Sequence, residues 1–94
     1  MAIASIVHKG LSDFFYRGRA GKLRADLVTR LAQRLQVLDR MEDLAALEAI
    51  PAWRLHPLIG RDLGRYSIWV NKNWRLTFEW DGKDVQILDL EDYH

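Results

Sequence analysis

The chain has 94 residues, which is enough for one domain around a single core, and we take residues 1–94 as that domain. Hydrophobic residues make up 49% of it, which excludes a disordered protein, and the lack of cysteine excludes a disulfide scaffold, a thiolate metal site and a cysteine nucleophile. No apolar run approaches the roughly 18 residues of a membrane span, and the N-terminus lacks the basic start of a signal peptide, so we expect a cytoplasmic location and no membrane partner.

The net charge of +1 conceals an uneven distribution of charge along the chain. Residues 1–40 hold eight Lys and Arg against three acids, whereas residues 41–94 hold six Lys and Arg against ten acids. Two interpretations stay open, which are two solvated faces or a basic helical half that meets phosphate. In either case the low net charge argues against strong unaided binding to bulk nucleic acid.

The first elements predicted along the chain are a short strand and a short helix. Residues 3–7 are mostly apolar and predict a first strand. Ser12 is a candidate N-cap for a short helix that carries Phe14 and Phe15. The glycines of residues 18–21 then bracket a basic loop.

Residues 23–40 give the strongest helical signal in the sequence. Leucines recur there at spacings of four, four, four and three, which forms one stripe along a helix, namely Leu23, Leu27, Leu31, Leu35 and Leu38. We expect this stripe in the core, and the side chains that fall away from it are Arg24, Arg30, Gln33 and Arg34. A short helical turn over residues 43–50 ends at Pro51.

From Trp53 onward the hydrophobic period changes to two, which predicts strands. The predicted strands cover residues 53–58, 66–71, 74–80 and 85–90, and the third has the clearest separation of an apolar and a polar face. Asn71-Lys72-Asn73 predicts a hairpin loop, because Asn tolerates positive φ. Asp81-Gly82 predicts a two-residue type I′ turn.

The order of these elements predicts the fold class. Helices gathered early and strands gathered late are typical of an α+β fold. We expect the N-terminal strand and the helices to pack on one face of a mainly antiparallel sheet of four to five strands. The other face of the sheet would then be free for a partner or a substrate.

Histidine is the side chain best suited to gain or lose a proton near neutral pH, and the chain has three. His8, His56 and His94 are too far apart for a local metal motif, and no carboxylate stands at a ligand spacing beside them, so we expect no metal site. His56 would point off the core face together with Arg54, and Pro57 keeps it extended. It is either an ordinary exposed strand histidine or a reactive one.

The last three residues, Asp92, Tyr93 and His94, combine an acid, a phenol and an imidazole. One interpretation is a frayed tail, because chain ends are usually frayed. The other is a set of acid–base groups with a ring that stacks on a base, since a predicted strand runs almost to this end and anchors it.

Arg75 lies on the polar face of the clearest strand, where it is either a solvated arginine or a phosphate clamp. A guanidinium matches phosphate oxygens in two-point geometry, which favours the second role if RNA is the substrate. The candidate RNA-binding residues around it are Arg54, Arg61, Arg65, Lys72 and Asn73. Trp69 shares the polar side, and we expect it to cover the sheet rather than to stack on RNA.

Five segments, in one order along nearly the whole chain, resemble the HigB family of toxins in the RelE superfamily. They are His8-Lys9-Gly10-Leu11 with Phe15 and Gly18, Leu55-His56-Pro57-Leu58 with Gly60, Tyr66-Ser67-Ile68, Asn73-Trp74-Arg75-Leu76-Thr77-Phe78, and Glu91-Asp92-Tyr93-His94. The resemblance implies a RelE-like fold, ribosome-dependent cleavage of mRNA, no cofactor, and a HigA-like helix-turn-helix antitoxin as partner. The active-site set that it implies is His56, Arg75, Asp92, Tyr93 and His94. One departure is Ile59, where family members often carry lysine, so that one positive contact is either missing or supplied by Arg61 or Arg65.

These residue types suit an RNase that works without a metal. RNA carries its own nucleophile, the 2′-hydroxyl, and the enzyme must take its proton, offset charge on the phosphate and protonate the leaving 5′-oxygen. His56 and His94 would be the acid–base groups in an order left open, and Arg75 would stabilise the phosphate charge. Tyr93 would stack on or orient a base, and Asp92 would orient a histidine or join the proton transfer.

Two other functions remain open at this point. One is a toxin of the same fold that acts on DNA gyrase, as in the ParE branch, although a gyrase inhibitor needs no acid–base pair. The other is a catalytically degenerate toxin kept as a corepressor that binds the antitoxin, for which Ile59 is the one hint.

Overall fold

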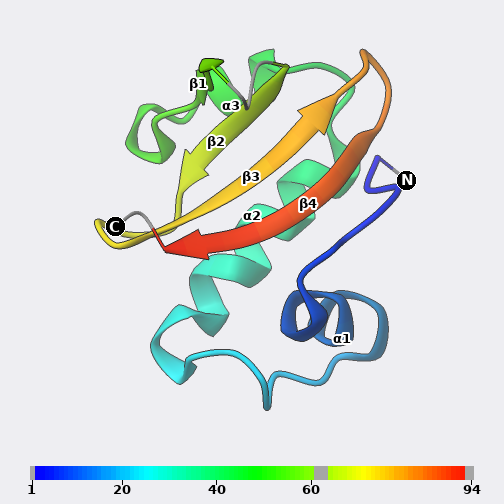
Figure 1. The fold of residues 1–94 in the computed structure, drawn as a ribbon, viewed down its shortest axis with the longest axis vertical. Helices are drawn as coiled ribbons and strands as arrows, with labels where there is room; N and C mark the ends of the chain where they lie inside the picture. The colour runs from blue at the N-terminus through cyan, green and yellow to red at the C-terminus, as the bar shows by residue number, and fades with distance from the viewer. Residues whose placement is uncertain (1, 61–63, 93–94) are drawn as a thin grey trace.

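The computed structural model describes residues 2–60 and 64–92, so the predictions for Arg61, Tyr93 and His94 lie outside the described residues. The elements in chain order are α1 (Lys9–Arg17), the 3₁₀ turn η1 (Ala25–Leu27), α2 (Val28–Arg40), α3 (Ala45–Glu48), the 3₁₀ turn η2 (Pro51–Trp53), β1 (His56–Pro57), β2 (Arg65–Trp69), β3 (Trp74–Trp80) and β4 (Val85–Asp92). The strands form one antiparallel sheet in the order β1-β2-β3-β4, and α2 crosses one of its faces (Figure 1). The predicted α+β fold is confirmed.

The core lies between α2 and the sheet. The predicted leucine stripe is confirmed, because all five of its leucines are buried. They pack in one cluster with the apolar side chains of the sheet, which include Ile68, Leu76, Phe78, Leu88 and Leu90. Apolar area removed from water at these positions contributes the main stabilisation, about 25 cal/mol per Å² buried.

The helix α1 begins one turn earlier than the sequence predicted. The N-cap is His8, whose Nδ1 accepts the Leu11 N–H at 3.0 Å, whereas Ser12 lies inside the helix. The prediction of Ser12 as cap was therefore wrong, because the His8 ring supplies the acceptor that a serine hydroxyl usually supplies. At the other end Gly18 takes the left-handed conformation of a C-cap, with φ 70°.

The predicted helix over residues 23–40 begins as the turn η1 and becomes α-helical in α2. One of the residues away from the leucine stripe, Arg34, is only 7% exposed. Its Nε donates to the Trp69 carbonyl at 2.7 Å, and its guanidinium lies 4.6 Å from the centre of the Trp53 ring. Arg34 therefore fastens α2 to the end of β2, and its burial lowers the pKa of the guanidinium.

The predicted strand over residues 53–58 is reduced to the two residues of β1. Trp53 belongs to the turn η2, and Arg54 is left-handed with φ 51°, which breaks the extended chain. Pro57 lacks an N–H, which limits further pairing but is tolerated at a sheet edge, where β1 stands. The short strand still fixes a register, since His56 pairs with Ser67.

The predicted N-terminal strand over residues 3–7 forms two isolated parallel bridges to β4, Ile3 with Val85 and Ile6 with Leu88. Between these bridges the register of β3 and β4 shifts, and Ile87 has φ 52°. Ile87 is therefore the extra residue of a β-bulge. Because of the bulge, the N-terminal segment touches β4 at two points without becoming a strand.

The turn between β3 and β4 is longer than the predicted two residues. It covers residues 81–84, and the Asp81 carboxylate accepts the N–H groups of Lys83 and Asp84 at 2.8 and 2.7 Å. These bonds lower the pKa of Asp81. Gly82 has φ 94°, a conformation that explains the glycine. The predicted hairpin loop at residues 71–73 is confirmed, but the predicted reason was wrong, because neither Asn71 nor Asn73 has positive φ. The Asn71 side chain instead holds the loop by accepting the N–H groups of Asn73 and Trp74.

Candidate active site

Polar and charged side chains gather on the sheet face opposite α2. The pairing register aligns one row across all four strands, which consists of His56, Ser67, Thr77 and Asp89. A neighbouring row consists of Trp69, Arg75 and Glu91. Aligned residues on neighbouring strands share a face, and so do residues two apart on one strand. The register therefore brings His56 and Arg75 to one face, with Cα atoms roughly 12 Å apart at ordinary strand spacings.

His56 is exposed on the edge strand β1. Its Nδ1 lies 3.1 Å from the carbonyl oxygen of Arg54. The hydroxyl of Ser67, beneath it on β2, lies 3.4 Å from both ring nitrogens. The ring is thus held from its own loop and from the sheet below, while its face stays open to solvent. This is the exposed, oriented imidazole that acid–base chemistry requires.

Beneath Arg75, three polar side chains form a connected network. Arg65 donates from Nη2 to Thr77 Oγ1 at 2.8 Å and to the Ile87 carbonyl at 3.1 Å. The Thr77 hydroxyl in turn donates to the Glu91 carboxylate. Glu91 stands directly across from Arg75 in the register of β3 and β4. Thr77 is fully buried, so this network lies at the base of the polar side chains on this face.

The predicted RNA-binding residues differ in their exposure and in the contacts that they make. Arg65 is 16% exposed and also lies 3.8 Å from Glu79, so its guanidinium is committed to the sheet. Arg54 is exposed, with its guanidinium 4.1 Å from the centre of the Trp69 ring. Lys72 is exposed and Asn73 is half-buried in the loop that leads to Arg75. Their contact with RNA stays a prediction.

Asp92 lies on the other face of the sheet from His56 and Arg75. Its partner in the register is Trp74, which packs against the core, whereas Arg75 pairs with Glu91. The negative charge of Asp92 contributes to raising the pKa of Arg24, after the larger effect of Asp26. The structure therefore brings two of the five expected active-site residues together and separates Asp92 from them. Tyr93 and His94 follow outside the described residues.

The sequence interpretation missed Ser67, Thr77 and Glu91. Each lies on the polar side of a strand by simple alternation, so the period of two could have placed them beside His56 and Arg75. The missing information was the strand register, which the sequence does not give.

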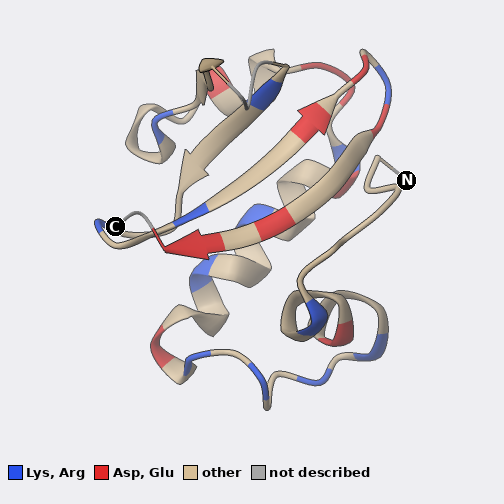
Figure 2. Cartoon of the chain, viewed as in Figure 1, with Lys and Arg blue, Asp and Glu red and all other residues tan. Residues whose placement is uncertain are grey.

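The basic residues between α1 and α2 form a segment that Figure 2 shows as a row of positive charge. Two acids neutralise part of it. Lys22 lies 3.0 Å from Asp13, and Arg24 lies 3.2 Å from Asp26. The hydrogen bond from Lys22 lowers the pKa of Asp13, and that from Arg24 lowers the pKa of Asp26. Two of the three acids of residues 1–40 are therefore paired within this basic segment, which leaves fewer unpaired cations there to meet phosphate.

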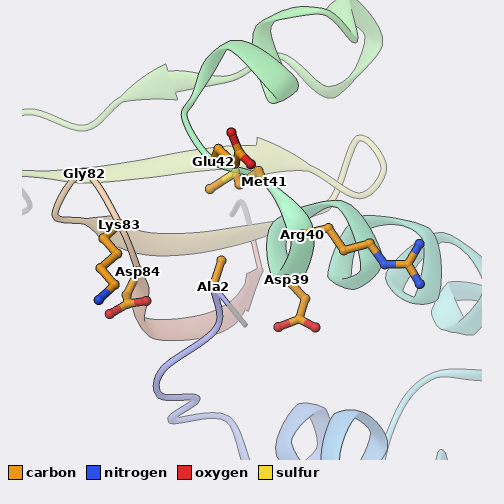
Figure 3. A pocket seen from close by; sticks show the side chains of 8 residues that line it. All are labelled: Ala2, Asp39, Arg40, Met41, Glu42, Gly82, Lys83 and Asp84. Carbon is orange, nitrogen blue, oxygen red and sulfur yellow. The ribbon is translucent and has the colours of Figure 1, made fainter.

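A pocket of about 400 Å³ lies at the far end of β3 and β4 from Arg75 (Figure 3). It is lined by Ala2, Asp39, Arg40, Met41, Glu42, Gly82, Lys83 and Asp84. It forms where the N-terminal segment is tied to the end of α2, because the Ala2 N–H donates to the Asp39 carbonyl at 2.8 Å. His56 and Arg75 do not line this pocket.

Among the residues that the structure describes, no group of three or more His, Asp and Glu side chains is placed to hold a metal ion. In the same part of the chain no helix has the length and apolar character to cross a membrane. The expected absence of a metal in catalysis stays a prediction.

Comparison with known proteins agrees with this fold. Residues 4–94 match a family described as the RelE-like toxin of type II toxin-antitoxin system HigB. The Endoribonuclease HigB of Proteus vulgaris is 40% identical over 92 residues, which cover 98% of this chain and 99% of that protein. The fold is that of a RelE-like toxin domain. The chain belongs to the HigB-like toxin family of type II toxin–antitoxin systems, whose toxins have an antitoxin as partner.

Proposed function

We propose that the chain is a ribosome-dependent mRNA endoribonuclease and the toxin of a type II toxin–antitoxin pair. Family membership and the printed activity of the Proteus vulgaris relative support an endoribonuclease. The single observation that carries the proposal is the placement of an exposed imidazole, His56, and a guanidinium, Arg75, on the same open face of the sheet. That spacing suits groups that act on opposite sides of one phosphodiester.

The reaction uses the nucleophile that RNA itself provides. The 2′-hydroxyl attacks the adjacent phosphorus, the bond to the 5′-oxygen breaks, and one proton leaves the first oxygen while another joins the second. One histidine takes the first proton and another group donates the second. Arg75 offsets the negative charge that builds on the phosphate oxygens. No metal or cofactor is needed for this balance.

The end of the chain supplies the remaining groups. In the register of β3 and β4, Glu91 lies across from Arg75 and Asp92 across from Trp74, so the described part of β4 runs alongside the strand that carries Arg75. His94 would be the second acid–base group, and Tyr93 would stack on or orient a base. Asp92, on the opposite face beside Arg24, would orient the tail rather than touch the phosphate.

The ribosome and a HigA-like helix-turn-helix antitoxin are the proposed partners. A protein of net charge +1 binds bare RNA weakly, so the ribosome would hold the mRNA and supply the in-line geometry that cleavage needs. The cytoplasm, where ribosomes and mRNA meet, is the proposed location.

The test is a reconstituted translation reaction in which primer extension maps cuts in the mRNA. His56→Ala should lower the cut rate by about 10²–10⁴-fold, the usual value of general acid–base help. Arg75→Ala should lower it by about 10²–10³-fold, the usual cost of one donor to a developing charge. Arg40→Ala, which removes an exposed arginine at the end of α2, is the matched control and should cut at the wild-type rate.

Three results would contradict the proposal. Wild-type cutting by both site variants would exclude this face as the active site. Growth arrest with DNA-damage signalling and intact mRNA would favour the gyrase target. A chain that neither cuts mRNA nor arrests growth would favour the degenerate corepressor.

A further inference from the structure

Arg54 adopts a backbone conformation that a residue with a side chain rarely takes. Its φ and ψ are both 51°, in the left-handed region, directly after the turn η2. This conformation is unfavourable for a residue that is not glycine, because it brings the Cβ atom too close to the following carbonyl oxygen. Among described residues other than glycine, only Arg54 and Ile87 have positive φ, and Ile87 is explained by its bulge. Some contact must therefore hold Arg54 in place.

The side-chain contact that helps to hold it is the stack on Trp69. The Arg54 guanidinium lies 4.1 Å from the centre of the Trp69 ring, within the range of a cation–π interaction. Trp69 is itself fixed, because its carbonyl accepts the Nε–H of the buried Arg34 at 2.7 Å. A surface cation–π contact is favourable and offsets part of this backbone cost. The stack therefore adds a contact between the loop before β1 and the sheet, beside the burial of Trp53 in the core and the Arg54 N–H that donates to the Pro51 carbonyl at 3.1 Å.

The consequence of this arrangement falls on His56. The Arg54 carbonyl oxygen lies 3.1 Å from His56 Nδ1, and a carbonyl oxygen can only accept a hydrogen bond. A neutral ring that donates to this oxygen carries its proton on Nδ1 and leaves the lone pair of Nε2 free. Ser67 Oγ does not change this choice, since it lies 3.4 Å from both nitrogens, at the outer limit of a hydrogen bond.

We propose that Arg54 and Trp69 act as a positioning pair, in which the stack holds the Arg54 carbonyl against His56 Nδ1 and so fixes the tautomer whose Nε2 can take a proton. The catalytic meaning of this pair rests on the proposed nuclease function, whereas the tautomer itself does not. Arg54 then contributes through its backbone and its stack, in addition to any contact with RNA.

The experiment reads the tautomer directly in the protein without RNA. Long-range ¹H–¹⁵N NMR spectra of histidine-labelled protein distinguish the two ring nitrogens, at a pH where the same spectra show the ring to be neutral. The signals of His56 are assigned by their loss in His56→Gln. Wild-type protein should show Nδ1 protonated and Nε2 bare. Arg54→Ala and Trp69→Leu should each give a mixture of both tautomers and lower the mRNA cut rate roughly tenfold, because misplacing a reacting group is costly.

Three further variants separate the stack from the charge. Arg54→Lys keeps the charge without the planar stack, so it should resemble Arg54→Ala. Arg54→Ala made in the Trp69→Leu background should add little to either single change, because both remove the same interaction. Lys72→Ala is the matched control, since it removes an exposed cation near the site and should leave the tautomer as in wild type whatever it does to cutting.

Two outcomes would overturn the proposal. The first is a wild-type ring with Nε2 protonated. The second is an unchanged tautomer in Arg54→Ala and Arg54→Lys with a lowered cut rate, which would make Arg54 an RNA contact only. Arg54 is exposed, so its variants keep the test valid if Trp69→Leu does not fold. Failure of the nuclease proposal is distinguishable, because a protein that does not cut mRNA can still show the Nδ1–H tautomer.

Discussion

Thr77 joins the charged side chains of the polar face through a single hydroxyl. It accepts a hydrogen bond from Arg65 and donates one to Glu91, and it is fully buried. Valine has the same shape without the hydroxyl, so Thr77→Val leaves both charged partners short of one hydrogen bond in a place that water reaches poorly. Removing one partner of a buried hydrogen bond costs more than the bond itself contributes.

We expect Thr77→Val to lower the free energy of unfolding by about 1–3 kcal/mol, measured by urea denaturation. Thr29→Val makes the same chemical change on an exposed position of α2 and should shift it by less than about 0.5 kcal/mol. Equal midpoints for the two variants would mean that the network beneath Arg75 does not stabilise the fold.

Ile59 is an exposed apolar residue at a position where a positive charge was expected. It is 84% exposed beside β1, at the position where HigB toxins often carry lysine. Of the two arginines that could replace that charge, Arg65 is committed to Thr77, Ile87 and Glu79. Arg65 is therefore a poor substitute for a mobile lysine at the rim of the site.

At the scale of the element, α1 is the clearest case in which an unusual residue performs an ordinary role. His8 caps the helix through Nδ1, although serine and aspartate are the usual caps. The sequence offered Ser12 as cap, and the structure places Ser12 in the first turn and a half of the helix. Substitution by alanine should therefore affect the free energy of unfolding differently at His8 and at Ser12.

His8→Ala should lower the free energy of unfolding by about 1 kcal/mol, because it leaves a helix N–H without its acceptor. Ser12→Ala should be neutral or slightly stabilising, because alanine is the better helix former inside a helix. Thermal or urea unfolding of both variants measures the difference. The reverse order would restore Ser12 as the cap.

At the scale of the whole molecule, charge decides how the protein meets RNA. The net charge is +1, and ion pairs with Asp13 and Asp26 neutralise part of the most basic segment. Few phosphates can then be neutralised by free cations, which makes binding to bare RNA weak at physiological salt. We expect cuts within codons when ribosomes translate the mRNA, and little cutting of the same mRNA without ribosomes, measured by primer extension. Comparable cutting of bare RNA would contradict this expectation.

The parts of the fold that follow from periodicity were predictable. The leucine stripe, the strand β3 and the hairpin at residues 71–73 all follow from local patterns, and each is confirmed. The parts that depend on contacts between distant residues were not. Arg34 is buried because it reaches the Trp69 carbonyl, and the strand over residues 53–58 is cut short by a left-handed Arg54 that a tryptophan far along the chain holds.

The candidate site, like the fold, was predictable where it depends on local pattern and not where it depends on contacts between distant residues. The identities of His56 and Arg75 came from resemblance and from alternation, and the register places them on one face. Asp92 was grouped with them by the resemblance, yet Asp92 and Glu91 are neighbours in β4 and face opposite ways, and it is Glu91 that pairs with Arg75. The residues beneath the site, Thr77 and Glu91, needed the register of β3 and β4 to be found.

The bulge at Ile87 has a consequence for which residues of β4 the solvent meets. Upstream of it Val85 is buried and Gln86 lies on the polar face, and downstream Leu88 is buried and Asp89 lies on the polar face. Loss of Ile87 alone would leave a strand of strict alternation with every other side chain on its present side. Loss of Leu76 in the neighbouring strand would instead turn half of that strand inside out. Position 87 is therefore where β4 can lose one residue while its other side chains keep their present sides of the sheet.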